Sequence, residues 1–214
     1  SETKPVQVVF KKHRVEILAM GASTGGPNAL MVLLQSLAGQ IDVPIVITQH
    51  MPAGFTTSFA ARLDSLCRIR VQEAKDGDRI LPGHAYIAPG GKQFSISRSG
   101  ANYVAVVQDG EPVNRHRPSV EVLFKSCVQY AGRNAYGIML TGMGNDGAAA
   151  MARLRQAGGR TIAESAETAV VFGMPQELIE RQGASVVLPC HNIAAQLRTW
   201  VPSRPGAAAA RGTS

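Results

Sequence analysis

The stretch LAMGASTGGP, residues 18–27, decides the fold of this chain. An apolar run ends at Gly21, Ser23 stands at the centre of a G-x-S-x-G turn, and a helical pattern follows from residue 28. This order of strand, tight turn and helix displays a hydroxyl at the carboxyl end of a strand, as in enzymes that use a nucleophilic serine. By itself the turn is also compatible with a phosphate cradle, or with a serine that only caps the following helix.

The same alternation of strand and helix continues along the chain. Apolar runs predict strands at residues 15–20, 44–48, 69–73, 135–140 and 160–163, and helical patterns cover residues 28–37, 56–66, 118–129 and 146–156. Three further short strand-like runs, residues 84–88, 93–97 and 103–107, are separated by Gly and Pro, which indicates an antiparallel hairpin or meander. The predicted fold is α/β: a doubly wound, mostly parallel sheet with helices on both faces and a small antiparallel hairpin insertion.

The two ends of the chain differ in composition from its middle. Residues 1–14 begin polar and finish in a run of charges, which is typical of a linker. Residues 15–201 hold every predicted strand and helix, so we expect one folded domain there. Residues 202–214 are mostly Pro, Gly, Ala and Arg without a pattern, and we expect a disordered tail. Because the chain does not begin with methionine, we expect a fragment of a longer protein.

Composition narrows the classes of function. The formal net charge of +7 permits an anionic partner, but aromatic residues are only 5% of the chain and no nucleic-acid-binding motif occurs, so we expect no nucleic acid. No apolar run approaches the roughly 20 residues that cross a bilayer, and no apolar leader opens the chain. We therefore expect a cytoplasmic protein without membrane insertion, in which Cys67, Cys127 and Cys190 are reduced thiols.

Three chemically competent side chains follow predicted strands. Ser23, His50 and Asp146 each stand shortly after the end of such a strand. In open α/β sheets the carboxyl ends of the strands border the ligand crevice, so we expect the three to meet there. A serine hydroxyl needs a base to take its proton, histidine titrates near neutrality, and a carboxylate orients the imidazole. The sequence thus predicts a catalytic triad in the order Ser, His, Asp.

Acyl transfer also requires hydrogen-bond donors for the oxyanion of the tetrahedral intermediate. The backbone amides around Thr24 and Met143 are the candidates, because they lie close in sequence to Ser23 and Asp146. The competing hypothesis is a binding module without catalysis. In that module Ser23 and Asp146 would cap the helices that follow them, and His50 would be structural.

A second motif predicts a different enzyme. Residues 142–147, GMGNDG, match G-x-G-x-x-G between a strand and a helix, and Glu164 follows at about the spacing of a ribose-binding acid. A dinucleotide-dependent oxidoreductase is disfavoured, because Asp146 would put a negative charge where the pyrophosphate must sit. His84, His116 and His191 lack zinc-ligand spacing with a cysteine or an acid. We therefore expect neither a cofactor nor a metal.

The basic turn NRHRP, residues 114–118, precedes a predicted helix. Two interpretations stay open at this point. The turn is either a surface loop, or it lines the crevice and meets an acidic substrate.

On these motifs the chain resembles the catalytic domain of the CheB family, the chemotaxis protein-glutamate methylesterases. The resemblance spans residues 15–200 and is carried by GASTGG (21–26), TQHMP (48–52) and LTGMGNDG (140–147), with HAYIAPG (84–90) and NRHRPSV (114–120) between them. No motif position departs from the family pattern. The resemblance makes residues 15–201 a methylesterase catalytic domain.

The resemblance implies hydrolysis of γ-glutamyl methyl esters on the cytoplasmic helices of methyl-accepting chemotaxis receptors, and deamidation of selected receptor glutamines. It assigns Ser23 as nucleophile, His50 as base and Asp146 as orienting acid, with Thr24 and Met143 assisting at the oxyanion. Family members usually carry an N-terminal receiver domain that restrains the esterase until it is phosphorylated. That domain is absent here, so we expect a catalytic part that is active without phosphorylation.

Overall fold

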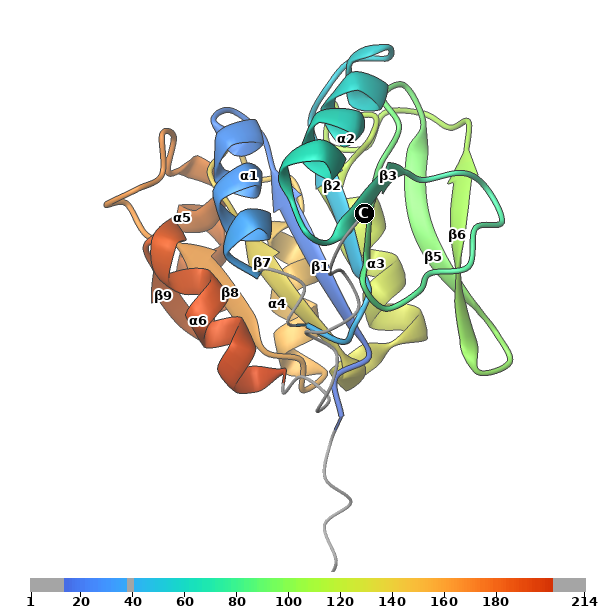
Figure 1. The fold of residues 1–214 in the computed structure, drawn as a ribbon. Helices are drawn as coiled ribbons and strands as arrows, with labels where there is room; N and C mark the ends of the chain where they lie inside the picture. Colours follow the sequence, from blue (N-terminus) through green and yellow to red (C-terminus); the bar gives the residue numbers. More distant parts are fainter. Residues whose placement is uncertain (1–13, 38–40, 202–214) are drawn as a thin grey trace, which may run out of the picture.

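Seven parallel strands form the central sheet, with helices on both of its faces (Figure 1). The computed structural model describes residues 14–37 and 41–201. The strands are β1 (Ile17–Ala22), β2 (Ile45–Gln49), β3 (Arg70–Glu73), β4 (His84–Ile87), β7 (Ala135–Met139), β8 (Thr161–Glu164) and β9 (Val186–Leu188). Their spatial order is β3-β4-β2-β1-β7-β8-β9, and every neighbouring pair is parallel.

The helices are α1 (Gly26–Leu37), α2 (Phe55–Leu66), α3 (Val120–Tyr130), α4 (Ala148–Gln156), α5 (Gly173–Glu180) and α6 (Cys190–Trp200), with a 3-10 turn at Gly132–Asn134. Buried side chains of α1, α2 and α6 share one apolar cluster, and those of α3, α4 and α5 share another. In α1, the fully buried Leu30, Leu33, Leu34 and Leu37 recur at helical spacing, which gives the helix one apolar face.

The sheet separates these two clusters. All six residues of β1 are buried, which is why its sequence is a continuous apolar run rather than an alternating one. Successive side chains of a strand point to opposite faces, so Leu18 and Met20 join the α1 side whereas Ile17 and Ala19 join the α3 side. The doubly wound α/β fold with helices on both faces is therefore confirmed.

The antiparallel insertion is smaller than the sequence suggested. Only β5 (Gln93–Ser99) and β6 (Asn102–Gln108) form the two-stranded antiparallel sheet, which lies beside α3. The grouping of residues 84–88 with this hairpin is wrong, because β4 pairs in parallel with both β2 and β3. The residues Ala85, Tyr86 and Ile87 are consecutive and all buried, as required of a strand covered on both faces.

Several sequence expectations concern the ends of the chain. Apart from Arg14, the predicted linker of residues 1–14 lies outside the described residues, and so does the predicted tail of residues 202–214. Within the described part, no helix has the length and apolar content needed to cross a membrane. Cys67, Cys127 and Cys190 are buried and form no disulfide.

Candidate active site

Three strand ends meet at the centre of the sheet. β1 lies between β2 and β7, with Ala22 paired to Gln49 on one side and Gly21 paired to Met139 on the other. Backbone hydrogen bonds continue past the strands: His50 N donates to Ala22 O at 3.1 Å and Ser23 N donates to Thr141 O at 2.9 Å. The loops that carry Ser23, His50 and Asp146 therefore start from neighbouring positions.

The serine turn is held from both sides. The buried Gln49 side chain donates from Nε2 to Ser23 O at 2.9 Å, and Thr141 Oγ1 donates to Thr24 O at 2.9 Å. Gly25 has φ +83°, a conformation that favours glycine. A side chain at Gly26 would overlap the Gln49 amide, so the second glycine lets helix α1 begin directly against β2.

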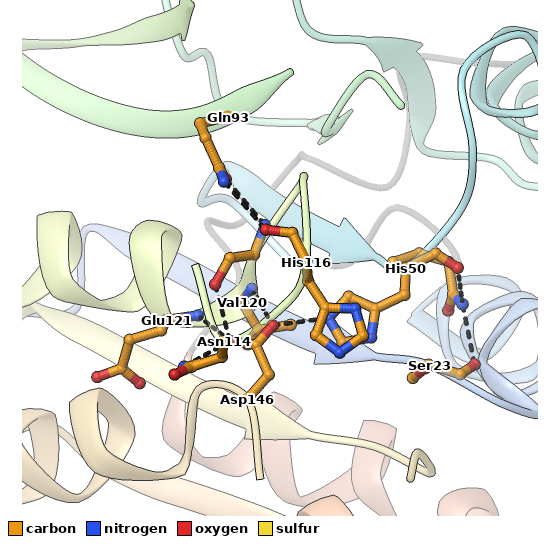
Figure 2. Close-up of polar contacts among 10 residues, drawn as sticks. Ser23, His50, Gln93, Asn114, His116, Val120, Glu121 and Asp146 are labelled. Carbon is orange, nitrogen blue, oxygen red and sulfur yellow. Dashed lines mark hydrogen bonds and ion pairs between the residues drawn. The ribbon is translucent and has the colours of Figure 1, made fainter. Parts of the chain in front are cut away.

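His50 and Asp146 form the shortest polar contact of the site. His50 Nε2 lies 2.6 Å from Asp146 Oδ2, and the two side chains are 8% and 1% exposed. The other ring nitrogen of His50, Nδ1, is buried and has no hydrogen-bond partner. In Figure 2 the His50 ring lies between Asp146 and Ser23. The arrangement leaves Nδ1 free to accept a proton once Nε2 donates to the carboxylate.

Asp146 accepts hydrogen bonds from five groups. Oδ1 accepts from Ser119 Oγ at 2.7 Å, Asn114 Nδ2 at 3.1 Å and Glu121 N at 3.2 Å. Oδ2 accepts from His50 and, at 2.8 Å, from Val120 N. Burial alone would raise the pKa of the Asp146 carboxyl, but these hydrogen bonds outweigh burial and hold its pKa below the ordinary value. Asp146 is therefore ionised at neutral pH.

This carboxylate caps a helix, although not the one that follows it. Its partners Val120 N and Glu121 N belong to the first turn of α3, where the backbone amides lack intrahelical acceptors. The negative charge also lies at the positive end of the α3 dipole. Helix α4, which follows Asp146 in sequence, instead begins after Gly147. The suggestion that Asp146 caps the helix that follows it is therefore wrong, because Asp146 caps α3, a helix that precedes it in the chain.

A second histidine covers the first. The rings of His50 and His116 are stacked, with centroids 3.5 Å apart and an interplanar angle of 4°. Burial, and after it the neighbouring charge of His50, lower the pKa of His116 despite the opposing influence of Asp146. The lone pairs of two parallel rings do not converge on one point, so the cluster of His50, His116 and Asp146 is a poor metal site despite its proximity.

The antiparallel hairpin anchors the loop that supplies His116. The buried Gln93 on β5 donates from Nε2 to Glu111 O at 3.1 Å and to His116 O at 3.0 Å. Its Oε1 accepts from Ser119 N at 2.9 Å (Figure 2). One side chain therefore ties both ends of the loop to the hairpin, which gives the insertion a place in the site.

The two predicted oxyanion donors flank Ser23. A side chain at Gly142 would lie 2.9 Å from Ser23 Cβ, so the loop that carries Met143 passes directly over the serine. Among the described residues, no acceptor is hydrogen-bonded to the amide of Thr24 or of Met143. Met143 is 69% exposed. Both amides are thus available to a ligand oxygen.

The structure brings Ser23, His50 and Asp146 to one edge of the sheet, as the sequence predicted, but in the described part no hydrogen bond joins Ser23 Oγ to His50. Sequence reasoning missed the side chains that position these groups. Asn114 and Ser119 bind the carboxylate and His116 stacks on the His50 ring. Gln49 binds the backbone of Ser23, and Gln93 binds the loop that carries His116. The basic turn was the available signal for three of them, because it contains Asn114 and His116 and is followed directly by Ser119.

The acid that the dinucleotide hypothesis needs, Glu164, is already bound within the protein. Glu164 is 1% exposed, its Oε1 accepts from Thr141 N at 2.9 Å, and its Oε2 accepts from Thr168 Oγ1 at 2.8 Å. Both carboxylate oxygens of Glu164 are thus already hydrogen-bonded within the protein, and almost none of the side chain is exposed to a ribose.

A cleft of about 280 Å³ opens beside the histidines. Its lining residues are His50, Met51, Pro52, Arg115, His116, Arg117 and Pro118. The basic turn therefore lines this cleft, and its residues Arg115 and Arg117 are at the same time exposed at the surface. No acidic side chain is among these seven residues.

Comparisons with known proteins agree with this architecture. Residues 18–197 match the family model described as CheB methylesterase. The chain is 60% identical over 194 residues to protein-glutamate methylesterase/protein-glutamine glutaminase 1 of Albidiferax ferrireducens, covering 90% of this chain and 52% of that protein. The corresponding values for the protein-glutamate methylesterase/protein-glutamine glutaminase of Salmonella typhimurium are 56% over 183 residues, 85% and 52%.

A solved structure is also similar. The crystal structure of the Thermotoga maritima CheB methylesterase catalytic domain superposes with a TM-score of 0.85 at 37% identity, covering 87% of this chain and 99% of that one. The chain spans about half the length of the curated relatives that it matches.

Proposed function

The chain belongs to the CheB methylesterase family, and from this premise we propose that it is a protein-glutamate methylesterase. Its substrates are γ-glutamyl methyl esters on the cytoplasmic helices of methyl-accepting chemotaxis receptors, and its products are methanol and glutamate. The observation that carries the proposal is the 2.6 Å contact between His50 Nε2 and Asp146, with His50 Nδ1 unpaired at the strand ends beside Ser23. Deamidation of receptor glutamines is proposed as a second reaction of the same serine.

The proposed reaction proceeds through an acyl-enzyme. Ser23 Oγ attacks the ester carbonyl carbon while its proton passes to His50 Nδ1. The tetrahedral oxyanion is stabilised by the free amides of Thr24 and Met143. Collapse breaks the bond to the methoxy oxygen, which takes the proton from His50 and leaves as methanol. Water then repeats the sequence, which releases glutamate and restores the Ser23 hydroxyl.

Asp146 determines which ring nitrogen acts as the base. Because the ionised carboxylate accepts a hydrogen bond from Nε2, the neutral imidazole carries its proton there and keeps the Nδ1 lone pair. When Nδ1 takes the serine proton, the carboxylate stabilises the imidazolium. In the familiar serine protease triad the carboxylate binds Nδ1 and Nε2 is the base, so the two nitrogens have exchanged roles here.

The remaining parts of the proposal concern the whole protein. Relatives about twice as long as the matched region leave room for the N-terminal receiver domain, and we propose that it restrains this domain until phosphorylated. The site is proposed to work in the cytoplasm, where the receptor helices are, without a cofactor, a metal, nucleic acid or insertion into the membrane. A binding module without catalysis is the competing hypothesis.

The test is methanol release from membranes that contain methylated receptors. Ser23→Ala and His50→Ala should each lower kcat by about 10³-fold or more, and Asp146→Asn by about 10²- to 10⁴-fold. Circular dichroism and urea unfolding check that each variant is folded. Unchanged turnover in folded Ser23→Ala contradicts the nucleophile, and retained receptor binding without turnover by the unsubstituted chain would favour the binding module. A full-length protein assayed in parallel shows whether a further region is needed.

A further inference from the structure

The tip of the basic turn is strained. Val113 N donates to His116 O at 3.0 Å and His116 N donates to Val113 O at 2.9 Å, so the two residues between them form a tight two-residue turn. Asn114 and Arg115 have φ values of 51° and 69°, which makes the turn type I′. Asn-Gly is the favoured pair in this turn. Arg115 therefore stands where glycine is preferred, at a cost of about 1–2 kcal/mol.

The strained conformation of Asn114 has an evident structural role, whereas that of Arg115 has none within the described part of the protein. Asn114 donates to Asp146, so its conformation serves the triad. The exposed Arg115 side chain makes no hydrogen bond or ion pair with any described residue, although it lines the cleft beside His50. Arg117, in the same lining, donates to Gly110 O at 2.8 Å and is thereby part of the loop framework. All N–H donors of the Arg115 guanidinium are therefore available to a ligand.

We propose that Arg115 is a specificity-determining residue, which binds a carboxylate side chain flanking the scissile ester on the substrate helix. This inference rests on the proposed methylesterase function. The guanidinium presents a planar fork that fits a carboxylate with two hydrogen bonds. The left-handed turn places Arg115 in the lining of the cleft, and no acidic residue of the lining competes for its guanidinium. On a helix, positions three and four residues from the ester share its face, so acidic residues there meet Arg115.

The experiment uses two synthetic helical peptides with one γ-glutamyl methyl ester each. One peptide carries Glu three and four residues before and after the ester, and its twin carries Gln at these positions. We expect the unsubstituted chain to prefer the acidic peptide by about 5- to 10-fold in kcat/KM, as for a partly exposed charge-assisted pair. Arg115→Gln should remove this preference and leave kcat/KM for the neutral peptide within about 2-fold.

Three further variants separate recognition from the shape of the turn. Arg115→Gly relieves the strain and should unfold at a higher urea concentration, yet lose the preference to the same extent as Arg115→Gln. Arg115→Lys keeps the positive charge but lacks the planar guanidinium, and it should retain only part of the preference for the acidic peptide. Arg68→Gln removes one exposed charge at the opposite edge of the sheet, before β3, and should keep the full preference.

The outcomes distinguish failure of the recognition role of Arg115 from failure of the proposed methylesterase function. If the unsubstituted chain releases methanol equally from both peptides, or if Arg115→Gln lowers both rates by the same factor, Arg115 is not a recognition residue and the methylesterase function stands. If neither the peptides nor methylated receptors release methanol, the proposed function itself fails. Should the peptides turn over slowly, their inhibition constants against receptor demethylation provide the same comparison.

Discussion

At the scale of single residues, the site depends on one buried carboxylate with no unused oxygen. Asp146 binds His50 at Nε2 and binds the first turn of α3 through two backbone amides. These contacts keep it ionised and fixed in orientation, and His50 Nδ1 is then the ring nitrogen that has no hydrogen-bond partner. The stacked ring of His116 limits rotation of the His50 ring from the other side.

We predict that His116 is a positioning residue for the base. His116→Ala removes the stacked ring and should lower kcat by about 2- to 10-fold with little change in KM, the range expected for an aromatic pair. His116→Phe keeps a flat ring and should recover most of that loss. Steady-state methanol release from methylated receptors measures both variants. Equal kcat values for His116→Ala and the unsubstituted chain would show that the stack has no role in turnover.

His116 also makes stability depend on pH. Its pKa is lowered in the folded state, so below its ordinary value near 6.5 the unfolded chain binds more protons than the folded one. The free energy of unfolding should therefore decrease as pH falls through and below that value. His116→Phe abolishes this contribution, and its urea midpoint should change less between about pH 7.5 and pH 5.5. A parallel pH dependence in both proteins would assign the effect to other groups.

At the scale of elements, the contact between the loop after β7 and the start of α3 holds the site together. Gly147 has φ +90°, and a side chain there would overlap the Val120 side chain, with Val120 Cβ at 2.9 Å. Close approach at this point is what brings the Val120 amide to the carboxylate of Asp146. Gly144, in the same loop, has φ +93°, but a Cβ added there would meet no atom within 4 Å.

These two glycines form a matched pair. Gly144→Ala should lower the free energy of unfolding by about 1–2 kcal/mol, because only the left-handed conformation is penalised. Gly147→Ala adds a clash in a packed contact and should lower it by about 2–5 kcal/mol, with a loss of kcat as α3 moves away from Asp146. Urea titrations of both variants measure the two losses in the free energy of unfolding. Equal losses would mean that Val120 yields freely and that the contact is not tight.

At the scale of the whole molecule, positive charge and sheet topology both favour binding at the carboxyl-end edge of the sheet. The chain carries a formal net charge of +7, and the cleft beside the histidines has two arginines and no acid in its lining. An acidic helix of the proposed substrate would be attracted by both the overall charge and the local one, and such attraction raises the rate of encounter. This cleft lies at the carboxyl end of β2, the neighbour of β1, and the carboxyl ends of the strands are where the ligand crevice of such sheets lies.

Catalytic efficiency should consequently depend on salt. Between about 20 mM and 500 mM NaCl, kcat/KM for methylated receptors should fall roughly 3- to 10-fold, because the screening length shrinks to a few ångströms. The effect belongs to KM and not to kcat. A small uncharged ester assayed under the same conditions is the control, and its hydrolysis should stay constant. If kcat/KM for the receptors does not change with salt, long-range electrostatic attraction does not contribute to substrate encounter.

Local properties of the chain were enough to predict most of the fold. Apolar runs and helical periodicity are determined by neighbouring residues, so the doubly wound sheet and the strand-turn-helix at Ser23 followed from them. The position of the three proposed catalytic residues at strand ends could be predicted for the same reason. The one misplaced segment, residues 84–88, is a short run, and short runs do not show whether they are covered on one face or on two.

What the sequence by itself determined was therefore most of the elements up to residue 163, but not α5, β9 and α6, and the chemistry available at the strand ends. Only the tertiary structure decided which nitrogen of His50 meets the carboxylate, that Asp146 caps α3 and not α4, and that the basic turn lines the cleft. These facts depend on contacts between segments that are about 30 to 100 residues apart. Such contacts arise when helices and strands pack around a common core, and packing has no periodicity along the chain from which they could be inferred.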